Sequence, residues 1–250
     1  MASRLVVVSG GGTGIGRAVA AAFAAAGDEV VILGRRPGPL AEAAEKINAA
    51  AGAERVRAHP ADLTEPDQVR AAAADITAGG RRVDVLVNNA GGNVAPAPPD
   101  SLERIRADWE ANIAGNVLPA VLLTAALLPA LRRPGGRIVT VTSIAAFRGP
   151  ATYGGAKAAL HPWAAELATA LGPEGVTVNV VAPGYVPDTE FYGARMSSEF
   201  DAGRVAQTLV GRGGTPAEVA AAVTYLASAD AGFVTGQILQ INGGARPGVG

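Results

Sequence analysis

The segment Leu5-Val-Val-Val-Ser-Gly-Gly-Gly-Thr-Gly-Ile-Gly16 decides the fold, because a short apolar run passes directly into a glycine cluster. Residues 5–8 have the length and the β-branched content of a buried strand. A helix is predicted to begin at about Gly16 and to continue to Ala26. Backbone N–H groups at such a strand-to-helix turn, together with the helix dipole, favour binding of a pyrophosphate.

The glycine spacing in this turn does not match the widely used G-x-G-x-x-G fingerprint. The spacing is G-x-x-x-G-x-G, with glycines at positions 10, 14 and 16. Glycine lets a ligand approach the backbone closely, and it also allows the chain to turn tightly for purely structural reasons. This turn by itself therefore leaves both a nucleotide site and a structural turn open.

Short β-branched runs and alanine-rich stretches alternate outward from the turn. Strands are predicted at residues 5–8, 29–33, 55–58, 83–87, 136–142, 177–181 and 238–241. Helices are predicted at residues 16–26, 40–51, 66–78, 102–131, 152–171 and 216–227. This alternation indicates an α/β fold with a parallel sheet and helices on both of its faces. Since no linker or repeat interrupts it, we expect a single domain over residues 1–250.

The alternation lapses between Pro183 and about Gly214. Residues 189–200 in this region carry Phe191, Tyr192 and Phe200, three of the nine Phe and Tyr residues in the chain. A long irregular insertion in a compact domain usually has a function. We therefore expect residues 187–210 to form a lid over a substrate.

Composition and charge narrow the classes of partner and of chemistry. The 21 basic and 22 acidic residues give a net charge of −1, so the chain has no basic field for nucleic acid. The absence of cysteine excludes thiolate chemistry, and His59 and His161 are too far apart in sequence to suggest a metal site. The residues before the first strand are unlike a targeting peptide, and the longest apolar run, 117–131, is short for a membrane span. We expect a cytoplasmic protein with a small-molecule partner, no nucleic acid and no membrane, and we expect 117–131 to be a buried helix and a candidate oligomer contact.

Polar residues follow several predicted strands at the edge where open sheets bind ligands. After the second strand stand Gly34, Arg35 and Arg36, at a place where dinucleotide sites often carry an acid for the adenosine ribose. Two guanidinium groups would instead bind a 2′-phosphate, which favours NADP(H) and leaves NAD(H) possible, unless they are merely solvated loop residues. Asp62-Leu63 and Asn88-Asn89-Ala90-Gly91 follow the next two strands, where ordinary turns would also place such residues.

Tyr153 and Lys157 provide the strongest candidate pair, because four-residue spacing on a helix places them on one face. A phenol with a pKa near 10 is a poor base at neutral pH, but a neighbouring ammonium favours the phenolate. Tyr153 could then exchange a proton with a substrate oxygen. Ser143, just beyond the strand 136–142, could hydrogen-bond the same oxygen. A helix-surface tyrosine beside a lysine is the alternative.

Taken in order along the chain, these motifs resemble the short-chain dehydrogenase/reductase family over essentially the whole sequence. The motifs are Gly10/Gly14/Gly16, Asp62, Asn88-Asn89-Ala90-Gly91, Asn112, Ser143, Tyr153/Lys157 and Pro183-Gly184. The resemblance implies a Rossmann-type, doubly wound parallel sheet of about seven strands. It also implies that Tyr153 is the acid/base, that Lys157 lowers its pKa and holds the nicotinamide ribose, that Ser143 orients the substrate oxygen, and that Asn112 supports Lys157.

The resemblance also implies which residues bind the cofactor. The cofactor-binding set is Ser9, Gly10, Gly12, Thr13, Gly14, Ile15, Gly16, Arg35, Arg36, Asp62, Leu63, Asn89, Ala90, Gly91, Tyr153, Lys157, Pro183, Gly184, Val186 and Thr189. Candidate substrate residues are Asn93, Phe147, Tyr185, Phe191 and Tyr192, whose rings suggest an aromatic or polycyclic substrate. The sequence departs from the family in a shortened segment between Ser143 and Tyr153, which predicts a different pocket on that side, and in having Ser9 where threonine is usual.

The expected function is therefore an NADPH-dependent carbonyl reductase that acts on a small ketone, with Tyr153 as the proton donor. An alcohol dehydrogenase would use the same atoms in reverse. The sequence also leaves open a scaffold recruited for imine reduction or cyclisation, and a cofactor-binding regulator without turnover. The family's usual contacts, at helices 117–131 and 152–171 and at the last strand, imply a homotetramer.

Overall fold

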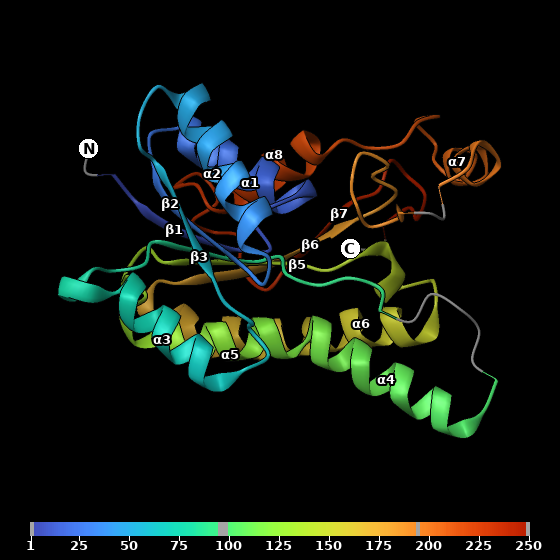
Figure 1. The fold of residues 1–250 in the computed structure, drawn as a ribbon, viewed down its shortest axis with the longest axis horizontal. Helices are drawn as coiled ribbons and strands as arrows, with labels where there is room; N and C mark the ends of the chain where they lie inside the picture. The colour runs from blue at the N-terminus through green and yellow to red at the C-terminus, as the bar shows by residue number, and fades with distance from the viewer. Residues whose placement is uncertain (1–2, 95–99, 194–195, 249–250) are drawn as a thin grey trace.

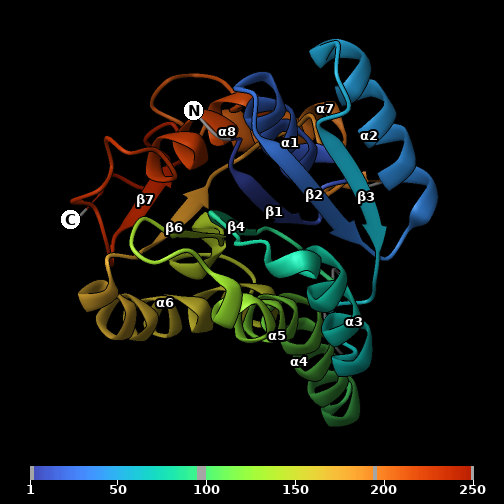
Figure 2. The same ribbon diagram turned by 90° about the vertical axis from the view of Figure 1, so that its left-hand side faces the viewer.

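The computed structural model describes residues 3–94, 100–193 and 196–248, and its described strands form one parallel sheet. The strands follow the order β3-β2-β1-β4-β5-β6-β7 (Figure 2). Their bounds are β1 Leu5–Ser9, β2 Glu29–Gly34, β3 Val56–Pro60, β4 Val85–Asn88, β5 Arg137–Val141, β6 Thr177–Pro183 and β7 Ile238–Ile241. The predicted doubly wound sheet is confirmed. The strand order reverses between β1 and β4, and a crevice for ligands is expected at their carboxyl ends.

Helices cover both faces of the sheet (Figure 1). On one face lie α1 Gly14–Ala25, α2 Pro37–Ala51 and α8 Pro216–Leu226. On the other lie α3 Pro66–Ile76, α4 Leu102–Asn116, α5 Leu118–Leu127 and α6 Ala151–Leu171. A further helix, α7 Ser198–Val205, stands beyond the carboxyl end of the sheet.

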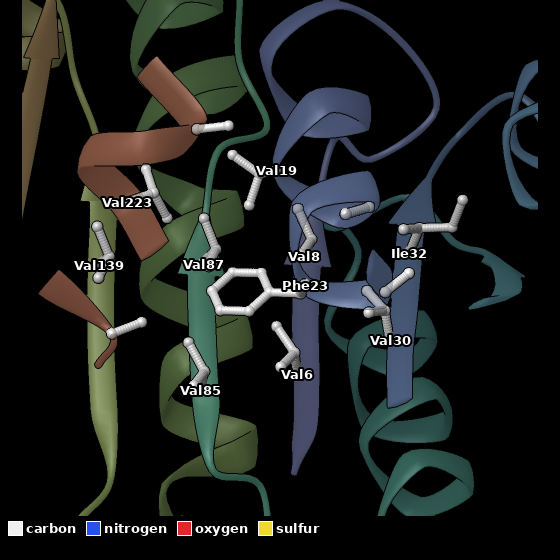
Figure 3. Packing of buried hydrophobic residues seen from close by; sticks show 14 of the residues in the cluster. Val6, Val8, Val19, Phe23, Val30, Ile32, Val85, Val87, Val139 and Val223 are labelled. Atoms are coloured by element: carbon white, nitrogen blue, oxygen red, sulfur yellow. The ribbon is translucent and has the colours of Figure 1, made fainter. Parts of the chain in front are cut away.

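The strands carry continuous apolar runs because both of their faces are buried. Val6 and Val8 of β1 face the layer that contains α1, where Val19 and Phe23 pack against them (Figure 3). The intervening Val7 belongs to the second apolar cluster, on the opposite face. Packing on both faces fixes the sheet, and with it the positions of the loops at its carboxyl edge.

The structure differs from the sequence prediction in two helical regions. The predicted helix 102–131 is two helices, because α4 ends before Val117 and Pro119 occupies the first turn of α5. Proline lacks the N–H that would continue a helix, and it is tolerated in a first turn. The segment predicted to be an irregular lid contains α7, which Ser197 caps by accepting a hydrogen bond from the Phe200 N–H at 3.1 Å. Residues 194–195 of the predicted lid 187–210 lie outside the described residues.

The stretch Leu102–Ala130 is long and apolar enough, by length and composition alone, to cross a membrane. A core helix of a soluble protein meets the same criterion. Here α5 packs against α3 and β4, and its Leu123 and Leu127 are fully buried. The helix is thus buried along one face only, since Leu118 and Ala125 are exposed, and the predicted burial is found in part.

Candidate active site

The glycine turn after β1 is shaped by three positions that only glycine can fill easily. Gly10 and Gly14 have φ values of +67° and +51°, in the left-handed region. A Cβ at Gly16 would lie 2.2 Å from the Gly10 carbonyl oxygen and 2.5 Å from Asn89 Nδ2. The turn is thus held compact at the start of α1, with Gly12, Thr13, Gly14 and Ile15 lining a cleft.

Side-chain hydrogen bonds join this turn to the loop after β4. Ser9 Oγ accepts hydrogen bonds from the N–H groups of Asn89 and Ala90, at 2.9 and 3.0 Å. Asn89 Nδ2 donates in return to the carbonyls of Ser9 and Gly10, at 3.1 and 3.2 Å. The β1 and β4 loops are therefore fixed relative to each other at the point where the strand order reverses.

The cleft at the carboxyl edge of the sheet has a volume of about 700 Å³. It is lined by most of the predicted cofactor residues: Gly10, Gly12, Thr13, Gly14, Ile15, Arg35, Arg36, Asp62, Leu63, Asn89, Ala90, Gly91, Tyr153, Lys157, Pro183, Gly184, Val186 and Thr189. Ser9 and Gly16 stand behind this lining as supports. Size, glycine turn and helix N-terminus all fit a dinucleotide.

The two arginines after β2 have different surroundings. Arg36 Nη2 lies 2.6 Å from Glu190 Oε2, and both side chains are well exposed. Arg35 lies close enough to Asp62 to help lower the pKa of that carboxyl, although hydrogen bonds from the Thr64 N–H and hydroxyl lower it more. Both guanidinium groups line the cleft beside the end of β2, where a 2′-phosphate would be bound.

Tyr153 and Lys157 lie on successive turns of α6 and are both buried. Lys157 Nζ donates to the Val141 carbonyl at 3.3 Å. Burial lowers the pKa of Lys157 to about 8, because an ammonium loses solvation inside the protein. An ammonium with three donors can hold further acceptors in the adjoining cleft, such as ribose hydroxyls.

Ser143 caps a short 3₁₀ turn, Ile144–Ala146, directly after β5. Its Oγ accepts a hydrogen bond from the Ala145 N–H at 3.1 Å. This contact orients the side chain and uses its oxygen as an acceptor, so its O–H can donate to a substrate. Ser143 and Tyr153 line the same cavity.

Asn112 lies fully buried on α4, with its Nδ2 donating to the Asp108 carbonyl at 3.0 Å. Its Oδ1 has no hydrogen-bond partner within the described parts of the chain. One turn later, buried Asn116 accepts from the Gly92 N–H at 3.0 Å and donates to the Gly92 carbonyl at 2.9 Å. Sequence reasoning missed Asn116, although two asparagines four residues apart on one helix could have indicated a buried polar face.

A second, smaller cavity adjoins the cleft at Ser143 and Tyr153. The predicted substrate residues Asn93, Tyr185, Phe191 and Tyr192 line it. The fifth predicted substrate residue, Phe147, is not among the lining residues: its ring packs 5.0 Å from the His161 ring and lies 4.3 Å from Arg246 Cζ. Arg148, Arg204 and Gln207 also line this cavity and were not predicted.

The fold and the arrangement of the site are those of an oxidoreductase that uses a dinucleotide cofactor. Comparisons with known proteins identify the family. Residues 10–246 match the family described as enoyl-(acyl carrier protein) reductase. The chain is 34% identical to the 3-oxoacyl-[acyl-carrier-protein] reductase FabG of Salmonella typhimurium, covering 96% of each chain. Among solved structures, a short-chain dehydrogenase from Burkholderia cenocepacia in complex with NADP is 33% identical, with a TM-score of 0.85 and 97% of each chain covered. A variant of actinorhodin polyketide ketoreductase with NADPH is 28% identical, with a TM-score of 0.86 and 98% of each chain covered.

The chain therefore belongs to the short-chain dehydrogenase/reductase family, and it is an oxidoreductase. The resemblance drawn from the ordered motifs is confirmed.

Proposed function

We propose that the protein is an NADPH-dependent ketone reductase in which Tyr153 is the proton donor. The observation that carries this proposal is the position of Ser143 and Tyr153, which line both the dinucleotide cleft and the smaller cavity. A substrate in the cavity and a nicotinamide in the cleft would therefore meet at these two hydroxyl groups. The similarity to a FabG reductase and to a polyketide ketoreductase supports reduction of a ketone.

The cofactor preference is NADP(H). Arg35 and Arg36 line the cleft beside the end of β2, and guanidinium groups are strong partners for phosphate. Structural relatives of this chain contain NADP or NADPH. The remaining cofactor residues would hold the dinucleotide through backbone N–H groups of the glycine turn and through Asp62, Leu63, Val186 and Thr189, which line the same cleft.

Bound NADPH would supply the hydride to the carbonyl carbon. Ser143 donates a hydrogen bond to the carbonyl oxygen and polarises it. The Tyr153 O–H transfers its proton to that oxygen as the C–O double bond becomes a single bond. The Lys157 ammonium stabilises the phenolate left on Tyr153 and would hold the ribose hydroxyls of the cofactor, with Asn112 supporting Lys157. The described parts of the predicted lid, 187–193 and 196–210, would exclude water from the site once substrate is bound.

The test is NADPH oxidation, followed optically, against a panel of ketones, quinones and β-ketoacyl thioesters, with NADH in parallel. We expect turnover with NADPH on at least one ketone, and its loss in Tyr153→Phe by about a thousandfold or more. Tyr153→Phe should still bind NADPH, which protein fluorescence measures independently. Full activity in this variant, or a product formed without net oxidation of NADPH, would overturn the proposal.

The proposal extends to the oligomeric state and the cellular location of the protein. We propose a cytoplasmic homotetramer, supported by the apolar side chains that α4 leaves exposed: Ile105, Trp109 and Ile113. Light scattering on the purified protein should give four times the chain mass. A monomeric mass would contradict it.

A further inference from the structure

The cavity beside Ser143 and Tyr153 is lined by two positive charges. Arg148 and Arg204 both line it, and no Asp or Glu does so among the described residues. Arg148 Nη2 donates to Gln207 Oε1 at 3.2 Å, and this partner is neutral. Within the described residues, neither arginine has a carboxylate within 4.0 Å. Both side chains are exposed and neither is paired with an acid at that distance.

The carboxylate of Asp201, which lies near Arg204, accepts a hydrogen bond from another side chain. Asp201 lies one turn before Arg204 on α7, and its Oδ1 accepts a hydrogen bond from Tyr185 Oη at 2.5 Å. Burial, followed by this hydrogen bond, raises the pKa of Tyr185, so its phenol stays protonated and keeps donating to Asp201. Asp201 thus anchors α7 to Tyr185 and forms no ion pair with Arg204 within 4.0 Å.

A continuous wall of aromatic rings joins Tyr153 to Arg204. The ring of Phe191 lies 5.4 Å from that of Tyr153 and 5.0 Å from that of Tyr192. The ring of Tyr192 lies 5.6 Å from that of Phe200, and Arg204 Cζ lies 5.0 Å from the centre of the Phe200 ring. Arg204 therefore stands at the far end of this wall from the proton donor.

We infer that the substrate is a ketone with a planar body and an anionic group, a carboxylate or a phosphate, at the end remote from its carbonyl. This inference rests on the proposed reductase function. The carbonyl would contact Ser143 and Tyr153, and the body would lie against Phe191 and Tyr192, the rings of the wall that line the cavity, since rings favour offset or edge contacts with flat groups. Arg148 and Arg204 would bind the anion, because guanidinium donates charge-assisted hydrogen bonds to oxyanions.

Three aryl ketones with the same acetyl group test this inference: 4-acetylbenzoate, its methyl ester and 4-acetylphenyl phosphate. We expect kcat/KM with NADPH to be about tenfold or more higher for an anion than for the neutral ester, as one charge-assisted contact predicts. The anion with the higher kcat/KM shows whether the group bound by the arginines is a carboxylate or a phosphate. Arg148→Gln and Arg204→Gln should each remove most of this preference through KM for the anions, with a much smaller change for the ester.

Arg246→Gln is the matched control. Arg246 also lies over an aromatic ring, that of Phe147, and it is not among the residues lining the cavity. Its loss removes the same charge nearby and should preserve the preference for the anion. Equal kcat/KM for ester and anions in the native enzyme, or an equal loss for all three in Arg204→Gln, would overturn the inference.

Binding separates this inference from the reductase proposal. Calorimetry on the enzyme–NADPH complex measures affinity for the acids and the ester whether or not any of them is reduced. If an anion binds more tightly than the ester, and Arg204→Gln removes this difference in affinity, the anionic substrate is supported even without turnover. Equal affinity for the acids and the ester rejects it, while turnover of the ester alone would still support a ketone reductase.

Discussion

Arg36 Nη2 lies 2.6 Å from Glu190 Oε2, so a side chain after β2 is joined to one after β6 across the dinucleotide cleft. Both side chains are about three-fifths exposed, at 61% and 60%, and such a surface ion pair contributes little stability. Glu190 would compete with the cofactor, because a 2′-phosphate would bind the same guanidinium group of Arg36.

Glu190→Gln should therefore tighten the binding of NADPH. The substitution keeps the shape of the side chain and frees Arg36 from a charged partner, so we expect the Kd for NADPH to fall about threefold, the equivalent of about 0.6 kcal/mol. NADH, which has no 2′-phosphate, should bind as before. Fluorescence titration at low and high salt measures both, and Glu42→Gln, which removes an exposed acid that pairs with Lys46 on α2, is the control. An equal gain for NADH would contradict the competition.

Lys157→Met should stabilise the protein while it removes activity. Burial lowers the pKa of Lys157 from 10.5 to about 8, so at neutral pH the folded state holds a charge that the unfolded state solvates better. This shift corresponds to a cost on the order of 3 kcal/mol, and losing the hydrogen bond to the Val141 carbonyl offsets about 1 kcal/mol of the gain. We expect a net gain of about 2 kcal/mol in the free energy of unfolding, measured by urea denaturation without cofactor.

The pH dependence of that difference identifies its cause. Between the folded pKa of about 8 and the unfolded value of 10.5, the unfolded chain binds more protons at this lysine, so the native protein gains stability as the pH rises. The advantage of Lys157→Met should therefore be largest below pH 8 and shrink toward about pH 10. An advantage that does not change with pH would attribute the gain to packing instead of charge.

Gly16→Ala should disrupt the cofactor turn. The new Cβ would lie 2.2 Å from the Gly10 carbonyl oxygen, which is backbone and cannot rotate away. We expect a loss of at least about 2 kcal/mol in stability and a loss of NADPH binding of more than tenfold. Gly38→Ala is the control, because its Cβ would meet nothing within 4 Å near the start of α2, and it should be neutral or stabilising. Thermal melting and cofactor titration measure both variants, and native-like binding by Gly16→Ala would show that the turn can widen.

The sequence predicted those parts of the molecule that depend on local pattern. Every strand was placed within a few residues, because parallel strands are short, apolar and bounded by turns. The break between α4 and α5 was missed, although Pro119 offered a signal. Arg148 and Arg204 could not be assigned to a common cavity, because they come from segments 56 residues apart that meet only through tertiary packing.

Phe147 shows a limit of prediction from position along the chain alone. Its place in a loop after β5 suggested contact with a substrate, but the sequence does not reveal which way a loop side chain points. The structure turns its ring toward His161 and Arg246. Position at the carboxyl edge of a sheet is thus a weaker guide for loop residues than for Ser143, whose backbone is held by the strand and by the following 3₁₀ turn.

The role of the buried side chain of Asn116 can be tested by substitution. Its amide clamps Gly92, and a Cβ at Gly91 would lie 2.5 Å from Asn116 Oδ1 and 2.8 Å from Lys157 Nζ. Asn116→Leu keeps the approximate volume and leaves the Gly92 groups unpaired, so we expect a loss of about 2–3 kcal/mol in stability and about a tenfold rise in KM for NADPH. Steady-state kinetics and urea denaturation measure the two effects.

The matched control is Asn48→Leu, because Asn48 clamps the chain after α2 by accepting from the N–H groups of Arg55 and Val56, at 2.9 and 2.7 Å, away from the cleft. This variant should lose stability without any change in KM. Asn116→Asp tests for a role beyond the fold. A carboxylate beside Lys157 should raise the pKa of that lysine. The alkaline limb of the pH–rate profile should then shift to higher pH, which a purely structural role would not cause. An unshifted profile, or a KM change of the same size in Asn48→Leu, would mean that Asn116 supports only the fold.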